Sequence, residues 1–368
     1  MIKKISILVN GPGEMWGWAR PINRELRKRD FHVSVHILPC QFSSGSEVVM
    51  AETMDFNEIH GCSNVFRTFQ ALGSSKTNCV LQLGGELLWG LLMKKAGKVP
   101  LLCYSYGYKK GMSYCDRVLT AYEEMAVPMR ERGIHAEVVG DLVKNSMDLD
   151  EDTLAWEKDK TRKIVFLPGS RPGLRSMALP FLAATLKELK ALSSDLEFRT
   201  LLPSFIEKEE LDHWGAMGMN PTTLRNREFL GSADLVIAPP GTNNLEIMHS
   251  HAPALVVIPF SFLKSIPVSG ALSLLERFPL GGEAMKVTIL RRSERKAGFV
   301  SWPNRIAKKE IQKEIRGDIT PKGLAMIIRK YLKDTAKLDR SRLEAISISS
   351  RSQGDGAYRI VELLEGMI

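Results

Sequence analysis

Three glycine-rich turns stand where an apolar run gives way to a helical pattern. They are residues 10–14 (NGPGE), 167–171 (LPGSR) and 239–246 (PPGTNNLE). Glycine lets the backbone approach a ligand closely, and a helix start offers unpaired N–H groups and a partial positive charge. Such turns therefore suit phosphate groups. None matches the P-loop pattern or a complete G-x-G-x-x-G, so the turns alone do not identify a nucleotide.

The two turns of the second half carry polar side chains that fit a nucleotide. Gly169, Ser170 and Arg171 combine a backbone nest, a hydroxyl and a guanidinium fork, which together suit a phosphate. The other turn opens a helix at Gly241, Thr242, Asn243 and Asn244. Glu246 lies one turn into that helix, where a carboxylate can accept hydrogen bonds from both hydroxyls of a ribose. A carboxylate favoured only by the helix dipole is the alternative, and the residues alone leave both open.

Four segments of the second half occur in an order that resembles a known family. They are residues 166–171 (FLPGSR), 232–246 (SADLVIAPPGTNNLE), 299–304 (FVSWPN) and 308–325 (KKEIQKEIRGDITPKGLA). Together they resemble lipid A disaccharide synthase, an inverting glycosyltransferase of the GT-B architecture, over roughly residues 160–335. The last segment looks like the helix that precedes the final nucleotide-domain helix of that family.

The resemblance implies a UDP-sugar donor, with a sugar of the N-acetylglucosamine type. It implies that residues 169–171 and 241–244 hold the diphosphate, that Glu246 holds the ribose, and that Asn304 lies close to the nucleotide-sugar. It also implies a metal-independent reaction without a cofactor, because helix dipole and arginine stabilise the departing UDP.

The first half departs from the family at the residues expected to act on the acceptor. The essential aspartate of the family's D-A-P-x-F-N motif falls on Gly84 or Gly85, and Asp141 replaces the histidine of its G-H-P loop. Sugar transfer needs a base to accept the proton of the acceptor hydroxyl. Glu86, Glu14 and Asp141 are the candidates, with Glu86 first because it follows a strand and a Gly-Gly turn. The alternative for Glu86 is a helix-start carboxylate without a catalytic role. We expect an acceptor other than the standard lipid A precursor.

The elements that must position these residues alternate between strand and helix patterns. Strands are predicted at residues 4–9, 31–38, 78–83, 100–104, 117–120, 136–139, 163–167, 196–202, 234–238 and 252–259, and helices follow most of them. This alternation predicts an α/β protein of two Rossmann-like domains facing a central cleft. We expect an acceptor domain over residues 1–150 and a nucleotide-sugar domain over residues 160–335. The helices of residues 336–368 are expected to pack back on the first domain or on a partner subunit.

Composition limits the partners and the cellular compartment that we expect for the protein. The chain of 368 residues has a formal net charge of +9, which suits phosphorylated ligands or an anionic membrane surface. No aromatic-basic motif of a nucleic-acid-binding protein occurs, so nucleic acid is not an expected partner. The odd number of five cysteines, without a C-x-x-C pair, favours a reducing cytoplasm. No apolar run approaches the ~20 residues of a membrane span.

Aromatic and sulfur-containing residues of the first half suggest contact with a bilayer. They are Trp16, Trp18, Trp89 and residues 112–114. With the basic charge they predict a peripheral protein on the inner face of the cytoplasmic membrane, which takes a lipid acceptor. Core packing is the alternative, and it is favoured for Trp89 because that residue lies inside an apolar helix.

Three functions remain open on the sequence. The leading hypothesis is a glycosyltransferase that moves a sugar from a UDP donor to a lipid-linked or other glycan acceptor, in lipid A or lipopolysaccharide biosynthesis, and that forms a homodimer. The first rival is a nucleotide-sugar 2-epimerase of the same fold. The second is a non-catalytic protein that binds a UDP-sugar.

Overall fold

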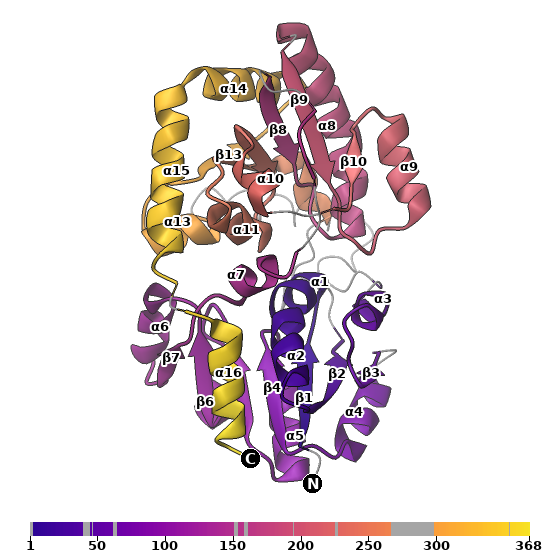
Figure 1. Cartoon of the computed structure of the whole chain (residues 1–368), viewed down its shortest axis with the longest axis vertical. Helices are drawn as coiled ribbons and strands as arrows, with labels where there is room; N and C mark the ends of the chain where they lie inside the picture. The colour runs from indigo at the N-terminus through magenta and orange to yellow at the C-terminus, as the bar shows by residue number, and fades with distance from the viewer. Residues whose placement is uncertain are drawn as a thin grey trace, which may run out of the picture. The chain divides into compact units, whose positions relative to one another are not determined.

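The chain folds into two compact α/β units. The computed structural model describes residues 3–39, 45, 47–61, 65–150, 154–157, 161–193, 195–224, 227–265, 298–352 and 354–368. One unit consists of Met1–Asp150 and Ser350–Ile368, and the other of Glu151–Ser349 (Figure 1). The expected C-terminal segment of residues 336–368 is therefore divided. Helix α15 (Thr335–Ser349) belongs to the second unit and helix α16 (Gly356–Glu365) to the first.

The first unit is built on a seven-stranded parallel sheet in the order β3-β2-β1-β4-β5-β6-β7. The strands are β1 (Lys4–Val9), β2 (His32–Ile37), β3 (Glu58–His60), β4 (Cys79–Leu83), β5 (Leu101–Tyr104), β6 (Arg117–Thr120) and β7 (Ala136–Val138). Strand order reverses at β1, which lies between β2 and β4, with Val9 opposite Leu83. The turns that carry Glu14 and Glu86 thus follow neighbouring strands at the carboxyl edge, where open α/β sheets bind ligands.

Helices cover both faces of this sheet. They are α1 (Pro12–Glu14), the π-helix η1 (Met15–Ala19), α2 (Arg20–Arg27), α3 (Glu47–Glu52), α4 (Val65–Ser74), α5 (Leu88–Gly97), η2 (Met112–Tyr114), α6 (Glu123–Arg130) and α7 (Leu142–Met147). Trp89 packs with Leu8, Leu72 and Leu101 in the core. Trp18 and Met112 are also buried, so these three side chains do not form the membrane-facing surface considered above. Core packing of Trp89 is confirmed.

Helix α16 is anchored to the first unit and lies beside α2 (Figure 1). Arg29, in the turn just after α2, donates to Glu365 over 2.6 Å, and its guanidinium lies 4.6 Å from the centre of the Tyr358 ring. At the start of α16, the backbone N–H of Ala357 donates to Asn145 Oδ1 over 3.1 Å. The end of the chain is thereby tied to both α2 and α7.

The second unit has a six-stranded parallel sheet in the order β10-β9-β8-β11-β12-β13. The strands are β8 (Arg162–Phe166), β9 (Leu196–Leu201), β10 (Pro221–Thr222), β11 (Leu235–Ala238), β12 (Ala254–Pro259) and β13 (Lys313–Gly317). Strand β13 corrects the expectation that residues 308–325 form a helix preceding the last helix of the nucleotide domain, since only the end of this run, from Pro321, is helical. Its residues pair with β12 from Leu255↔Lys313 to Pro259↔Gly317, because the apolar strand β12 needs a hydrogen-bonded neighbour on that side.

Alternate residues of β8 and of the position directly after it enter the two cores of the second unit. Ile164 and Phe166 pack with α8 (Pro172–Leu192), α9 (Lys208–Ala216) and α14 (Pro321–Lys333). Val165 and Leu167 pack with α10 (Arg227–Gly231) and α11 (Asn243–His249). This burial on both faces explains the continuous apolar runs of the central strands. Among the described residues, no helix combines the length and hydrophobicity that a membrane crossing requires.

Candidate functional site

Two of the predicted phosphate-binding turns contact each other in the second unit. We call them the β8 turn (residues 167–171) and the β11 turn (residues 239–243). Their strands are paired, with Phe166 opposite Ile237. Gly169 has a φ of 98°, and a Cβ built on it would lie 3.5 Å from Pro239 Cγ. A left-handed φ favours glycine, so Gly169 lets the β8 turn reverse direction against the β11 turn.

The β8 turn leads into the longest helix of the described residues. Arg171 is the N-cap of α8, which runs for 21 residues from Pro172, and its side chain is exposed. Ser170 beside it is half-buried. Proline at the first helical position suits a helix start, because no N–H is needed there. Backbone, hydroxyl and guanidinium are therefore collected at the positive end of the helix macrodipole.

Asn244 shapes the β11 turn from the inside. Its side chain is fully buried, accepts a hydrogen bond from Gly241 N at 3.0 Å and donates one to the carbonyl of Pro239 at 3.2 Å. Both ends of the amide thus bond to the turn's own backbone. The side chain of Asn244 therefore folds the turn, and the part of this residue in holding the diphosphate stays a prediction.

Glu246 follows in the first turn of α11 and is 9% exposed, while Thr242 and Asn243 at the helix start are half-buried.

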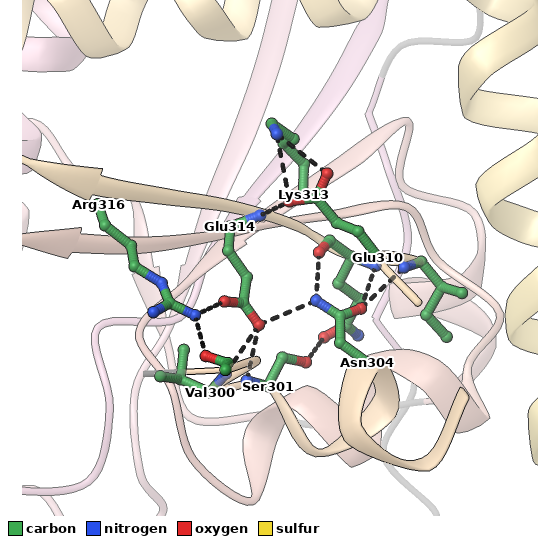
Figure 2. Close-up of polar contacts among 10 residues, drawn as sticks. Val300, Ser301, Asn304, Glu310, Lys313, Glu314 and Arg316 are labelled. Carbon is green, nitrogen blue, oxygen red and sulfur yellow. Dashed lines mark hydrogen bonds and ion pairs between the residues drawn. The ribbon is translucent and has the colours of Figure 1, made fainter. Parts of the chain in front are cut away.

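Asn304 is likewise a structural residue rather than a surface ligand. It is fully buried in α13 (Trp302–Ala307). Its Oδ1 accepts from the backbone N–H groups of Ile311 and Gln312, each at 2.8 Å. Its Nδ2 donates to the Gln312 carbonyl at 2.7 Å and to Glu314 Oε1 at 2.9 Å (Figure 2). All four hydrogen bonds of the amide are made inside the protein, and the expectation that Asn304 lies close to the nucleotide-sugar stays a prediction.

Glu314 is the centre of the network around Asn304 (Figure 2). Its side chain is 4% exposed and forms an ion pair with Arg316. Its Oε1 also accepts from the backbone N–H groups of Val300 and Ser301, at 3.0 and 2.9 Å. The network continues to Gln312, whose Nε2 donates to the backbone carbonyl of Asn244 over 2.9 Å. Buried polar groups thus connect β13 and α13 to the helix that carries Glu246.

The first unit brings Glu14 close to the Gly-Gly turn after β4. Cβ atoms built on Gly11 and Gly84 would lie 3.2 Å from Glu14 Oε2 and 3.7 Å from Glu14 Cγ. Glu86, after the same turn, is exposed, and its backbone carbonyl accepts from Gln82 Nε2 at 2.7 Å. The structure therefore places the two carboxylates on neighbouring turns at one edge of the sheet.

Asp141, which the sequence offers as a candidate proton acceptor, caps the start of a helix. It is 1% exposed and is the N-cap of α7, where its Oδ1 accepts from Val143 N at 3.1 Å. The same oxygen accepts from the Tyr106 hydroxyl at 2.6 Å, and that hydroxyl accepts from Trp18 Nε1 at 3.1 Å. Burial and the nearby Asp141 carboxylate raise the pKa of Tyr106 well above its usual value. Glu14 and Glu86 are the more accessible of the three candidate bases.

Gly84 and Gly85, the positions at which the resemblance to lipid A disaccharide synthase places an essential aspartate, leave no room for a side chain in this protein. Gly84 and Gly85 both have a φ of 64°. A Cβ on Gly85 would overlap the Asn10 amide, and one on Gly84 would lie 3.0 Å from the Trp18 ring. The glycines are therefore required by the shape of this turn, which packs against the turn after β1.

We expect Gly85→Asp to destabilise the first unit by about 2–3 kcal/mol without creating a base. A left-handed L-residue costs roughly 1–2 kcal/mol, and the overlap with Asn10 adds to it. Chemical denaturation measures the loss. Gly73→Asp is the control, because a Cβ at Gly73 meets nothing within 4 Å. Equal stability of both variants would contradict this account of the turn.

Metal binding finds no support in the side chains that the structure describes. In those parts of the chain, no group of three or more histidine, cysteine, aspartate or glutamate residues lies close enough to hold a metal ion.

Comparison with solved structures shows that the fold is shared with a putative epimerase, a protein solved with UDP and a glycosyltransferase. A putative UDP-N-acetylglucosamine 2-epimerase from Listeria monocytogenes matches with a TM-score of 0.65 and 12% identity, over 98% of this chain and 95% of that one. The S. aureus MnaA–UDP co-structure matches with a TM-score of 0.64 and 13% identity, over 100% and 98%. CalG4, the calicheamicin glycosyltransferase, matches with a TM-score of 0.58 and 11% identity, over 100% of both chains.

These likenesses confirm the predicted two-domain α/β fold, which this chain has in common with both glycosyltransferases and epimerases. No protein-family model matches the sequence, and no curated protein matches it. The fold match therefore does not single out lipid A disaccharide synthase.

Proposed function

We propose that the protein is a glycosyltransferase that transfers a sugar from a UDP donor to a glycan or lipid-linked acceptor. One observation carries the proposal: the β8 turn and the β11 turn lie against each other, each at a helix start, with Arg171 on one and Glu246 beyond the other. Such a pair of turns suits a diphosphate flanked by a cation, and the carboxylate suits the hydroxyls of a ribose.

Each candidate residue then has a defined task. The backbone of Gly169, Ser170 and Gly241, with the side chain of Arg171, would hold the diphosphate and stabilise the charge that develops on the departing UDP. Glu246 would accept hydrogen bonds from the ribose. Glu14 or Glu86 would take the proton of the acceptor hydroxyl as the bond to the sugar forms. No step in this scheme uses a metal ion or cofactor.

A 2-epimerase acting on a UDP-sugar is the second candidate. It is favoured by the likeness to a putative UDP-N-acetylglucosamine 2-epimerase reported above. An epimerase would change the sugar without any acceptor. A protein that binds a UDP-sugar without turnover would have the same nucleotide site.

Incubation with UDP-N-acetylglucosamine separates these functions. A transferase releases UDP when an acceptor-containing lipid extract is added and leaves the donor sugar unchanged without it. An epimerase converts the sugar to its 2-epimer in the absence of any acceptor. Binding of the donor with no product under either condition would exclude the epimerase and a transferase acting on these lipids, and no binding would contradict the proposed nucleotide site.

The finer part of the proposal concerns the acceptor and the setting. We propose a lipid-linked acceptor, a peripheral position on the inner face of the cytoplasmic membrane and a homodimer, in the biosynthesis of lipid A or a related lipopolysaccharide. The net charge of +9 and the exposed side chain of Tyr114 support contact with an anionic surface. Co-sedimentation with vesicles containing anionic lipid tests the membrane contact, and light scattering tests the dimer. Absence of binding at low salt would remove the membrane from the proposal.

A further inference from the structure

Two arginines begin helix α8, and their surroundings differ. Arg171 is exposed, whereas Arg175, one turn further along, is 3% exposed. A buried guanidinium loses its hydration and is tolerated only where it is paired and hydrogen-bonded. The arrangement around Arg175 is therefore specific. Neither the glycine pattern nor the family resemblance pointed to this residue.

The buried guanidinium bridges helix α9 and the β8 turn. Its Nε and Nη2 donate to Oε1 and Oε2 of Glu210, each over 2.7 Å, in a two-bonded ion pair. Its Nη1 donates to the backbone carbonyl of Ser170. The pKa of Glu210 is held below its usual value, first by the hydrogen bond from Arg175. The fully buried Trp214 of α9 also bonds to Glu210. We call this group of three, Arg175, Glu210 and the Ser170 carbonyl, the α8–α9 clamp.

The clamp fixes the direction of one peptide group in the β8 turn. In a trans peptide the carbonyl of one residue and the N–H of the next point in opposite directions, and the described chain contains no cis peptide. Because Arg175 holds the Ser170 carbonyl toward the interior, the N–H of Arg171 is directed the other way. That N–H lies at the start of α8, where an anion is favoured.

We propose that Arg175 is a positioning residue, which holds the Ser170–Arg171 peptide in the orientation needed to bind the diphosphate of a UDP-sugar. The inference rests on the proposed nucleotide site. Arg175 itself touches no substrate in this scheme. Its effect on binding passes through the peptide and is therefore confined to the phosphate end of the ligand.

The test compares UDP with uridine, which lacks the phosphates. In Arg175→Lys the compact ammonium cannot bond both carboxylate oxygens and the Ser170 carbonyl at once. We expect UDP to bind about tenfold more weakly, because the variant loses the effect of about one charge-assisted hydrogen bond. The affinity for uridine should stay within about twofold of the wild-type value. Both affinities are measured by calorimetry or by competition with a fluorescent uridine nucleotide. Arg199→Lys, in the ion pair with Glu157 of the same unit, is the matched control and should change neither.

A second variant separates positioning from stability. The exchange Arg175→Glu with Glu210→Arg restores an ion pair, but the carboxylate at 175 cannot donate to the Ser170 carbonyl. If both variants, at a temperature where they are folded, bind UDP about tenfold more weakly with uridine unaffected, the proposal holds whatever their melting temperatures. It is overturned if either folded variant binds UDP like the wild type, or if UDP and uridine weaken equally. Failure of the wild type to bind UDP would overturn the proposed function, and the role of Arg175 with it.

Discussion

Replacing Glu246 by alanine is expected to weaken UDP binding about 100-fold and to abolish turnover, while the second unit remains folded. Glu246 is 9% exposed in the first turn of α11, directly after the β11 turn. Two hydrogen bonds from ribose hydroxyls to a carboxylate are charge-assisted, at about 1.5–3 kcal/mol each, so losing both removes a factor of about 100 or more. Calorimetric titration with UDP measures the effect, and circular dichroism confirms the fold.

The control separates ribose binding from a general helix-dipole effect. Glu209 is an exposed carboxylate in the first turn of α9, so Glu209→Ala removes a comparable charge from another helix of the same unit. We expect its UDP affinity to match the wild type. Arg171→Ala should weaken UDP about tenfold, since one exposed cation contacts the diphosphate. If Glu246→Ala and Arg171→Ala both retain the affinity of the wild type, this surface is not the nucleotide site.

The central strands were predictable because each buries both faces. Lys4–Val9, Cys79–Leu83 and Leu235–Ala238 are short apolar runs with a glycine or proline within the next two residues, and the structure confirms them as β1, β4 and β11. The strands that were missed are β3, β10 and β13, which lie at sheet edges. Lys313–Gly317 contains a single apolar residue and is half-buried throughout. An edge strand buries too little to leave an apolar pattern.

The site was predictable in its backbone and less so in its side chains. Glycine marks a turn locally, so the β8 and β11 turns could be found from short motifs. Two of the polar side chains have partners that lie far away in the sequence. Asp141 meets Tyr106 from the segment after β5, and Arg175 meets Glu210 from the next helix, whereas Asn244 bonds to the backbone of its own turn. Asparagine, aspartate and arginine use the same atoms to bind a ligand and to form hydrogen bonds within the protein, and only the fold decides which of the two occurs.

The buried carboxylate of Glu314 is the side chain whose loss should cost the second unit most. It accepts three hydrogen bonds at Oε1 and pairs with Arg316 at Oε2 (Figure 2). Removing one member of a buried ion pair leaves the other without compensation, at about 3–5 kcal/mol. Glu314→Gln keeps the shape of the side chain but places an amide NH₂ group, itself a donor, among groups that donate hydrogen bonds. We therefore expect a loss of about 3 kcal/mol and a fall of about 6–12 °C in the melting temperature of the second unit.

Scanning calorimetry measures this fall, and a neighbouring carboxylate provides the comparison. Glu310 bonds to Lys313 at the surface, so Glu310→Gln should lower stability by no more than about 1 kcal/mol. The Glu314 network ends on the Asn244 carbonyl of α11 through Gln312. Glu314→Gln should therefore also weaken UDP binding at temperatures where the unit is still folded, whereas Glu310→Gln should not. A Glu314→Gln protein with the melting temperature of the wild type would contradict this account. The ion pair would then only offset the cost of its own desolvation, and Asn304 and the two backbone N–H groups would form equivalent hydrogen bonds with the neutral side chain.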